Sequence, residues 1–352
     1  MIDILEYILP YISGLYTLPW ILFGFFVTIL LGRIVGRNKI DRAMKKVGLV
    51  LLYFFIPALV FRIFLDNFEE EQIAFVIITS IVILFMYILA FFFIKYSITK
   101  QGLEETNRNL YLKTVLINQG RSTAFIGSAM MAYWPVEAGI FIALVGIALF
   151  AVMPYILSYL HKKESKNSEE NHNIHAFPWF LKLYPWYLII FVVTPIIINN
   201  QTGITTQSLG DLGVLIKFYT AVTIPAALYY VGASIHPSDL KISEMKKLIG
   251  LDKKVNDEGH WIWVRKMFLL TVIITPLALA IIFTPLLAIG LIPSTWFAVI
   301  IINSILPVTS TNMFLLPYGI DKKSTAHIIT WTTIVCVPIV VLLITFFKLI
   351  FT

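Results

Sequence analysis

The sequence predicts an all-α membrane protein in which ten transmembrane helices form two inverted five-helix repeats, with crossed, interrupted helices at spans four and nine. Ten runs of the 352-residue chain are apolar enough to cross a hydrocarbon layer, which takes about 20 residues per helix. Of the 27 Lys and Arg residues, 23 fall in alternate connecting segments, on one face of such a bundle. A polar segment, His161 to His175, divides the ten runs into five and five.

The composition indicates an integral membrane protein. The chain is 59% hydrophobic and 13% charged, whereas about a quarter of the residues in a soluble domain are charged. Its net charge of +7 is concentrated in short segments next to the apolar runs, where contact with anionic lipid explains it. No groove-reading motif accompanies the charge, so we expect a lipid bilayer and no nucleic acid among the partners.

The apolar runs define the expected spans. In chain order they are Leu15 to Leu31, Val47 to Leu65, Ile73 to Ile94, Tyr111 to Trp134, Glu137 to Leu160, Tyr184 to Asn199, Asp211 to Ile235, Val264 to Leu291, Thr295 to Pro317 and Ser324 to Phe351. The first run lacks a basic leader and a small-residue cleavage site, so it is expected to be a retained helix.

The charges of the connecting segments set the expected orientation. The basic segments are Arg33 to Lys46, Lys95 to Lys113, Lys162 to Lys182, Lys241 to Lys266, and Lys322 with Lys323. By the positive-inside rule these segments are cytoplasmic. The opposite segments carry acidic residues and no Lys or Arg. We therefore expect a multi-pass protein of the cell membrane with both termini outside.

An odd number of spans in each half inserts the second half upside down, which is the inverted-repeat arrangement of many secondary transporters. The expected units are residues 1–160, a cytoplasmic linker at 161–183, and residues 184–352. Two short matches support the repeat: Ile56 to Leu59 with Ile224 to Leu228 at an offset of 168, and Ser122-Thr123 with Ser310-Thr311 at an offset of 188.

Polar residues interrupt spans four and nine at matched positions of the two halves. Gly120 and Pro307 weaken helical continuity there. Unwound backbone at membrane depth is tolerated where it lines a cavity or is buried in protein. The predicted substrate-binding residues are Asn118, Gln119, Arg121, Ser122, Thr123, Pro307, Thr309, Ser310, Thr311 and Asn312. The alternative for each residue is a hydrogen bond that holds neighbouring helices together.

Arg121 is the most specific single signal. It lies about ten residues inside span four, where an unpaired charge costs at least ~3 kcal/mol. No carboxylate lies in the interior of any expected span. Its guanidinium is therefore expected to meet backbone carbonyls, polar side chains, water or a bound anion. The alternative role is a structural brace between the crossing helices.

The other polar residues do not define a catalytic or metal-binding site. His172 and His175 in the linker are two potential metal ligands without a third, and His327 is either a core residue or a proton carrier. The sequence has no nucleotide loop, paired-carboxylate site or Ser/His/Asp arrangement. We therefore predict neither an enzyme nor a protein with a metal or cofactor. Cys336, the single cysteine, excludes an intrachain disulfide.

Three segments of the second half resemble the auxin efflux carrier family, which includes PIN-like carriers and bacterial malate or malonate permeases. They are Val231 to Ser234, the run around Pro307, and Tyr318 to Asp321. The resemblance implies a scaffold of spans one, two, six and seven and a mobile transport unit of spans three to five and eight to ten. It also implies a substrate site at the crossing of spans four and nine, with Asn118 and Pro307 at family positions. Span four lacks the proline that the family has at its crossing point and has Gln119-Gly120-Arg121 instead.

These features predict a secondary transporter, an exporter of a small organic anion such as a carboxylate, that works by elevator-type alternating access. The lack of a buried carboxylate argues against an NhaA-like cation/proton antiporter. The alternatives are a sodium-coupled organic-anion symporter, as in bile-acid carriers of the same architecture, and a ligand-binding membrane sensor on the same fold. The sequence leaves open whether the protein forms a homodimer.

Overall fold

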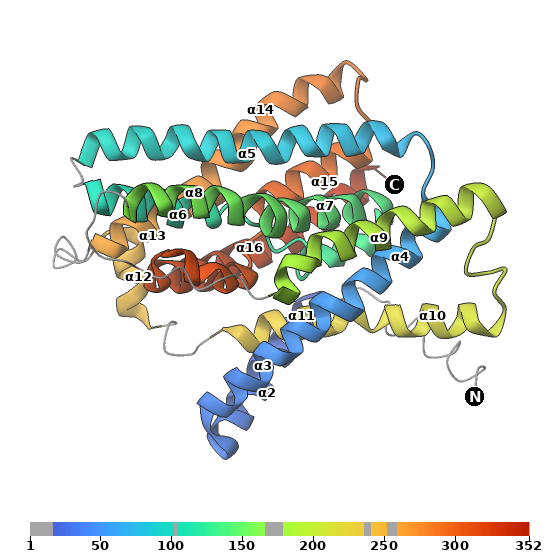
Figure 1. Cartoon of the computed structure of the whole chain (residues 1–352), viewed down its shortest axis with the longest axis horizontal. Helices are drawn as coiled ribbons and strands as arrows, with labels where there is room; N and C mark the ends of the chain where they lie inside the picture. The colour runs from blue at the N-terminus through green and yellow to red at the C-terminus, as the bar shows by residue number, and fades with distance from the viewer. Residues whose placement is uncertain (1–16, 102–104, 166–178, 236–240, 252–258, 352) are drawn as a thin grey trace.

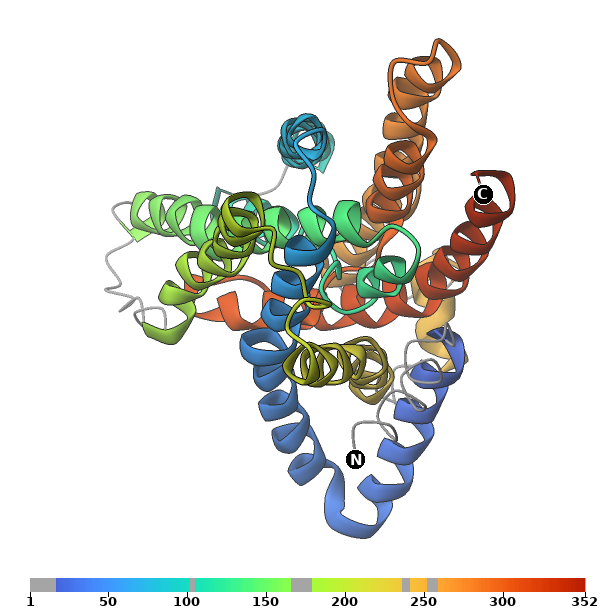
Figure 2. The same ribbon diagram turned by 90° about the vertical axis from the view of Figure 1, so that its right-hand side faces the viewer.

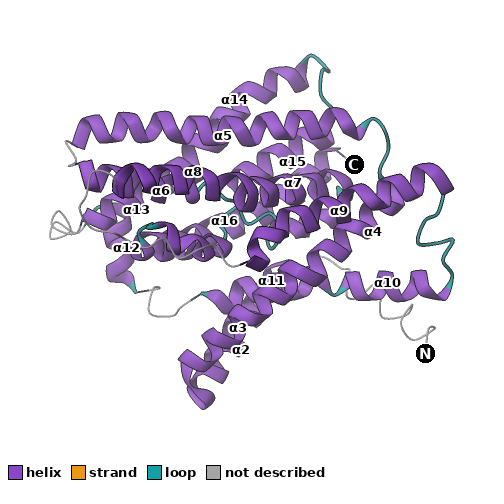
Figure 3. Cartoon of the chain, in the orientation of Figure 1, coloured by secondary structure: helices purple, strands orange, loops and turns teal. Residues whose placement is uncertain are grey.

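The computed structural model describes residues 17–101, 105–165, 179–235, 241–251 and 259–351. These residues are almost entirely helical, and none of them belongs to a named strand (Figure 3). Seven helical stretches are long and apolar enough to cross a membrane, and Ser294–Ile305 is a shorter apolar helix. The chain is therefore an all-α protein with the helices of a multi-pass membrane protein.

The first stretch, Leu18–Asn67, is 50 residues long and folds back on itself. It comprises α2 (Thr17–Leu31), η1 (Gly32–Gly36), α3 (Arg37–Val50), η2 (Leu51–Phe55) and α4 (Ile56–Asn67). The reversal occurs at Gly36, whose φ of 98° and ψ of 130° are not helical and favour glycine. Figure 2 shows the two blue arms meeting at a turn, so the stretch forms two helical arms.

The remaining elements follow in chain order. They are α5 (Gln72–Gln101), α6 (Glu105–Ile117), η3 (Gly127–Ala132), α7 (Pro135–Ile147), η4 (Ala148–Val152), α8 (Met153–Ser165), α9 (Trp179–Thr202), α10 (Asp211–Ala221), α11 (Thr223–Ser234), α12 (Ile242–Ile249), α13 (Gly259–Leu269), η7 (Leu270–Ile274), α14 (Thr275–Ala288), α15 (Ser294–Ile305), η8 (Ser310–Tyr318) and α16 (Lys322–Phe351). In Figure 1, α5 runs along one side of the molecule with α6, α7 and α8 beneath it.

Three of the long helices contain a wide π-helical turn just before a proline. The turns η2, η4 and η7 end at Phe55, Val152 and Ile274, and Pro57, Pro154 and Pro276 follow two residues later. Proline has no backbone N–H and its ring clashes with the preceding turn. A π turn widens the helix locally, which lets the helix continue past the proline.

Helices α2 and α11 make the most extensive contact between two described helices. Gly24 on α2 faces the backbone carbonyl of Tyr229, and Gly232 on α11 faces that of Ile21, with no room for a Cβ at either position. Small residues allow this close approach, as is common between helices in membranes. Large exposed apolar side chains, such as Phe26, Leu84 and Ile281, cover the outward faces of α2, α5 and α14.

The structure adds detail to three segments of the sequence interpretation. The segment Arg33 to Lys46 is helical apart from its break at Gly36, because α3 begins at Arg37. Lys113, counted with a connecting segment, is buried in α6 and has interaction partners. Helix α8 continues to Ser165 and α9 begins at Trp179, so both helices extend into the expected linker at 161–183. His172 and His175 lie outside the described residues.

Candidate functional site: the crossing of two interrupted helices

Helix is interrupted at both predicted positions. Helix α6 ends at Ile117, and the chain is irregular until η3 begins at Gly127. Helix α15 ends at Ile305, and η8 begins at Ser310. Gly120 and Pro307 lie inside the two breaks, and Pro307 cannot donate the hydrogen bond that would continue α15.

The two breaks pair with each other through their backbones. Ser122 N donates to Pro307 O over 2.8 Å, and Thr309 N donates to Gly120 O over 3.1 Å. Arg121 and Val308 face each other in this antiparallel bridge. Val308 N donates to the hydroxyl of Thr332 on α16 over 3.1 Å. Five backbone groups that the helix breaks would leave unsatisfied are thereby paired. We call residues 118–126 and 306–309 the crossover.

The side chain of Arg121 is buried at the crossover, and only 2% of the residue is exposed. Its three guanidinium nitrogens have no hydrogen-bond partner among the described residues. The side chain lines a cavity of about 10 Å³ together with Gln119, Tyr87 on α5 and Val145 on α7. The Tyr87 hydroxyl and the Cys336 thiol lie close enough to interact with it electrostatically. An arginine with five N–H donors thus has its hydrogen-bonding capacity unused.

Other buried polar atoms around the crossover also have no partner in the described structure. They are Asn118 Oδ1, Gln119 Oε1, Asn303 Oδ1, Asn312 Nδ2 and Asn312 Oδ1. The amide of Asn312 lies against Gly120, where a Cβ would come within 2.7 Å of Oδ1. Native structures leave few buried polar groups unsatisfied, so a cluster of them needs an explanation.

Some predicted site residues already have structural partners. Asn118 Nδ2 donates to Thr114 O on its own helix and, over 3.4 Å each, to Met267 Sδ and Thr325 Oγ1. The Thr309 and Thr311 hydroxyls are 3.0 Å apart, and Thr309 caps the start of η8. The bonds of Asn118 to Met267 and Thr325 match the alternative of a bond that holds neighbouring helices together, whereas the Thr309–Thr311 contact is local.

The structure separates the remaining predicted residues between two sides of the crossover. Gln119 and Arg121 face α5 and α7, as described above. Ser122 and Ser310 line a second cavity, of about 20 Å³, against Ser234 on α11 and Thr333 on α16. Thr123 is buried in the same break, and Pro307 supplies a backbone carbonyl. Each cavity holds about one water molecule, so the site is closed in this conformation.

Sequence reasoning missed several residues of the site. Tyr87 lines the Arg121 cavity. The Tyr230 hydroxyl on α11 lies 3.5 Å from the Ser310 hydroxyl. The Thr332 hydroxyl accepts a hydrogen bond from Val308 N. Single Tyr and Thr residues within apolar runs are common, so no local pattern distinguished them. The polar stripe Thr325, Thr332 and Thr333 on span ten was the one available signal.

No protein-family model matches the sequence, and a search of curated proteins gave no significant match. Within the described residues there is no group of three or more His, Cys, Asp or Glu side chains that could hold a metal ion.

Proposed function

We propose that this chain is a secondary transporter that exports a small organic anion, a carboxylate, across the cell membrane by elevator-type alternating access. The observation that carries the proposal is Arg121, whose buried guanidinium has no hydrogen-bond partner in the described structure. A planar guanidinium binds a carboxylate through two parallel hydrogen bonds. No carboxylate of the described helices pairs with it.

The neighbouring amides suit the same ligand. Asn312 Nδ2 is a second unused donor next to the crossover, and it would complement the guanidinium around an anion. The unused oxygens of Asn118, Gln119 and Asn303 accept hydrogen bonds, so they would serve hydroxyl groups of the substrate or a co-transported cation. With no buried acid in the site, we expect coupling to the anion gradient, the membrane potential or a proton.

The small size of both cavities fits a carrier in an occluded conformation. The second cavity lies between the crossover and α11, which belongs to the proposed scaffold. Sliding the crossover past α11 would separate Ser310 from Tyr230 and open this space to a substrate. In the proposed mechanism, the transport unit makes this movement in one direction and then the other, which gives alternating access.

The inverted repeat is part of the proposal, and two features support it. The Thr223 hydroxyl donates to Phe55 O, and these residues are separated by 168, the offset of the proline motifs. Residues at equivalent positions meet in this way near a two-fold axis. The two backbone hydrogen bonds of the crossover also match each other: adding 187 to the numbers of Gly120 and Ser122 gives Pro307 and Thr309, the other two residues of these bonds. This offset is one residue from the serine offset. Any antiparallel bridge has local two-fold symmetry. Membership of the auxin efflux carrier family, with both termini outside, completes the proposal.

Transport into proteoliposomes tests the function. We expect uptake of at least one labelled carboxylate to be accelerated by the same carboxylate inside the vesicles, and to be equal with sodium or choline outside. Arg121→Gln should abolish this counterflow, whereas Arg62→Gln, on α4, should retain it. Ligand binding without counterflow would favour the sensor instead, and a steep sodium requirement would favour the symporter.

Cysteine labelling tests the topology. In a Cys336→Ser background, an impermeant thiol reagent applied to intact cells should label Gln201→Cys and not Ser168→Cys. The opposite pattern would contradict both the orientation and the inverted repeat.

A further inference from the structure

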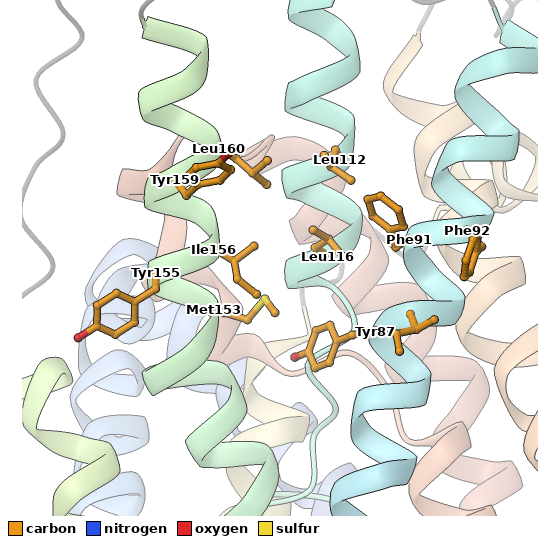
Figure 4. Close-up of a pocket in the computed structure, with 11 residues that line it drawn as sticks. Tyr87, Phe91, Phe92, Leu112, Leu116, Met153, Tyr155, Ile156, Tyr159 and Leu160 are labelled. Carbon is orange, nitrogen blue, oxygen red and sulfur yellow. The ribbon is translucent and has the colours of Figure 1, made fainter.

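A lateral groove between α5, α6 and α8 is lined almost wholly by apolar side chains and has a volume of about 700 Å³. Figure 4 shows Ile156 on α8 pointing toward Leu116 on α6, with Tyr87 near one end of the space between the helices. Phe91 and Phe92 on α5 and Tyr159 on α8 border the groove and are exposed. In a bilayer this groove therefore opens to lipid chains and not to water.

The charge at one end of the groove indicates which lipid occupies it. Lys95 lies one turn beyond Phe91 on α5, and Arg108 lies one turn before Leu112 on α6, and both are exposed. Helix α8 continues past Leu160 with Lys162 and Lys163. In the sequence, residues 95–108 and 160–165 together contain five basic and three acidic residues, so the net charge around this end is positive. Residues three or four apart share a helix face, so Lys95 and Arg108 lie beyond the apolar stretch on the groove-lining faces of α5 and α6.

We propose that this groove binds one acyl chain of an anionic phospholipid, with the lipid phosphate at the end marked by Lys95 and Arg108. Apolar burial alone would not select a lipid, because every bilayer chain is equally apolar. Any acyl chain that fits the groove gains dispersion contacts with its lining side chains. Selection for a charged headgroup comes from the basic residues, at about 1 kcal/mol for each Lys or Arg near the membrane surface, or about fivefold in affinity.

Occupancy of the groove would also support the wall of the anion cavity. Tyr87 lines both the groove and the cavity of Arg121, so a bound chain packs against the side chain that separates the two. The lipid proposal itself depends only on the chain being embedded in a membrane, and it stands or fails independently of the transported substrate.

Native mass spectrometry of the full chain, extracted from nanodiscs of equal phosphatidylglycerol and phosphatidylcholine, tests the proposal. We expect retained phosphatidylglycerol to exceed retained phosphatidylcholine. Lys95→Gln and Arg108→Gln should each lower phosphatidylglycerol retention about fivefold, while Lys45→Gln, an exposed basic residue of α3, should not. Ile156→Trp should fill the groove and lower retention about tenfold. Ile281→Trp, on the outward face of α14, should not.

Equal retention of the two lipids by the wild type would overturn the proposal. Retention unchanged in both Lys95→Gln and Arg108→Gln would do the same. These exposed positions make the test independent of whether Ile156→Trp folds, because their side chains pack against no core. Loss of retention in Ile281→Trp equal to that in Ile156→Trp would show a general lipid annulus and would contradict a defined groove.

Discussion

The α2–α11 contact and the crossover both bring two backbone segments close together, but only the crossover surrounds them with polar side chains that have no hydrogen-bond partner. In the α2–α11 contact, Gly24 and Gly232 each meet a carbonyl of the other helix, and the helices pack along their length. In the crossover, Gly120 meets the amide of Asn312, and the surrounding Arg, Asn and Gln side chains keep unused donors and acceptors.

Under the proposed function, the difference separates a region that contributes stability from a region whose polar groups bind the substrate. The α2–α11 contact gains from packing alone, which is the main source of helix association in lipid. The crossover pairs its two breaks through backbone hydrogen bonds and leaves several side-chain atoms unsatisfied, at a cost of about 1–3 kcal/mol for each buried group. A fold retains such a cost where the groups have another partner during function.

The largest effect is expected in the α2–α11 contact. Gly232→Ala would place a Cβ against the Ile21 carbonyl, and relief requires the two helices to move apart. We expect a loss of about 3 kcal/mol in the free energy of unfolding. The control is Gly139→Ala, also buried, whose Cβ would meet Phe64 at an ordinary 3.5 Å. Thermal unfolding of both purified variants tests this prediction. Equal unfolding temperatures would contradict a stabilising role of the α2–α11 contact.

A smaller loss is expected where the crossover backbone depends on one hydroxyl. Thr332→Val leaves the buried N–H of Val308 without its acceptor, which should cost about 2 kcal/mol. Thr333→Val is the matched control, because its hydroxyl donates only to Ile329 O on its own helix. A stability loss in Thr333→Val as large as that in Thr332→Val would mean that the Val308 hydrogen bond contributes nothing specific.

Two asparagines, Asn118 in the crossover and Asn312 beside it, allow a further comparison. Asn118→Leu removes the Nδ2 hydrogen bonds to Thr114, Met267 and Thr325 and should cost about 1 kcal/mol. Asn312→Leu removes an amide without partners, so stability should be unchanged or higher while carboxylate binding weakens. If Asn312→Leu proves the more destabilising of the two, its amide has a structural role.

The breaks in the helices could be predicted from sequence because Gly120, Pro307 and several polar residues stand where an apolar helix is expected. The apolar runs likewise predicted the long helices, because hydrocarbon thickness fixes their length. The sequence could not show that Asn118 is hydrogen-bonded while Asn312 is not, since their partners come from distant segments. Nor could it separate Tyr87, which lines the Arg121 cavity, from a tyrosine that faces only lipid.

The role of Arg121 is the central claim, and ligand-induced thermal stabilisation of purified variants tests it most directly. A panel of carboxylates should include at least one that stabilises the wild type. Arg121→Lys keeps the charge and loses the planar fork, so binding should weaken by about 1–3 kcal/mol.

Arg121→Gln should weaken binding more, yet unfold without ligand at or above the wild-type temperature, because it removes a buried charge that has no protein partner. Arg62→Gln, whose guanidinium donates to Lys217 O far from the crossover, should bind as the wild type does. If Arg121→Gln unfolds at a lower temperature and still binds the carboxylate with wild-type affinity, Arg121 is a structural brace and the anion site lies elsewhere.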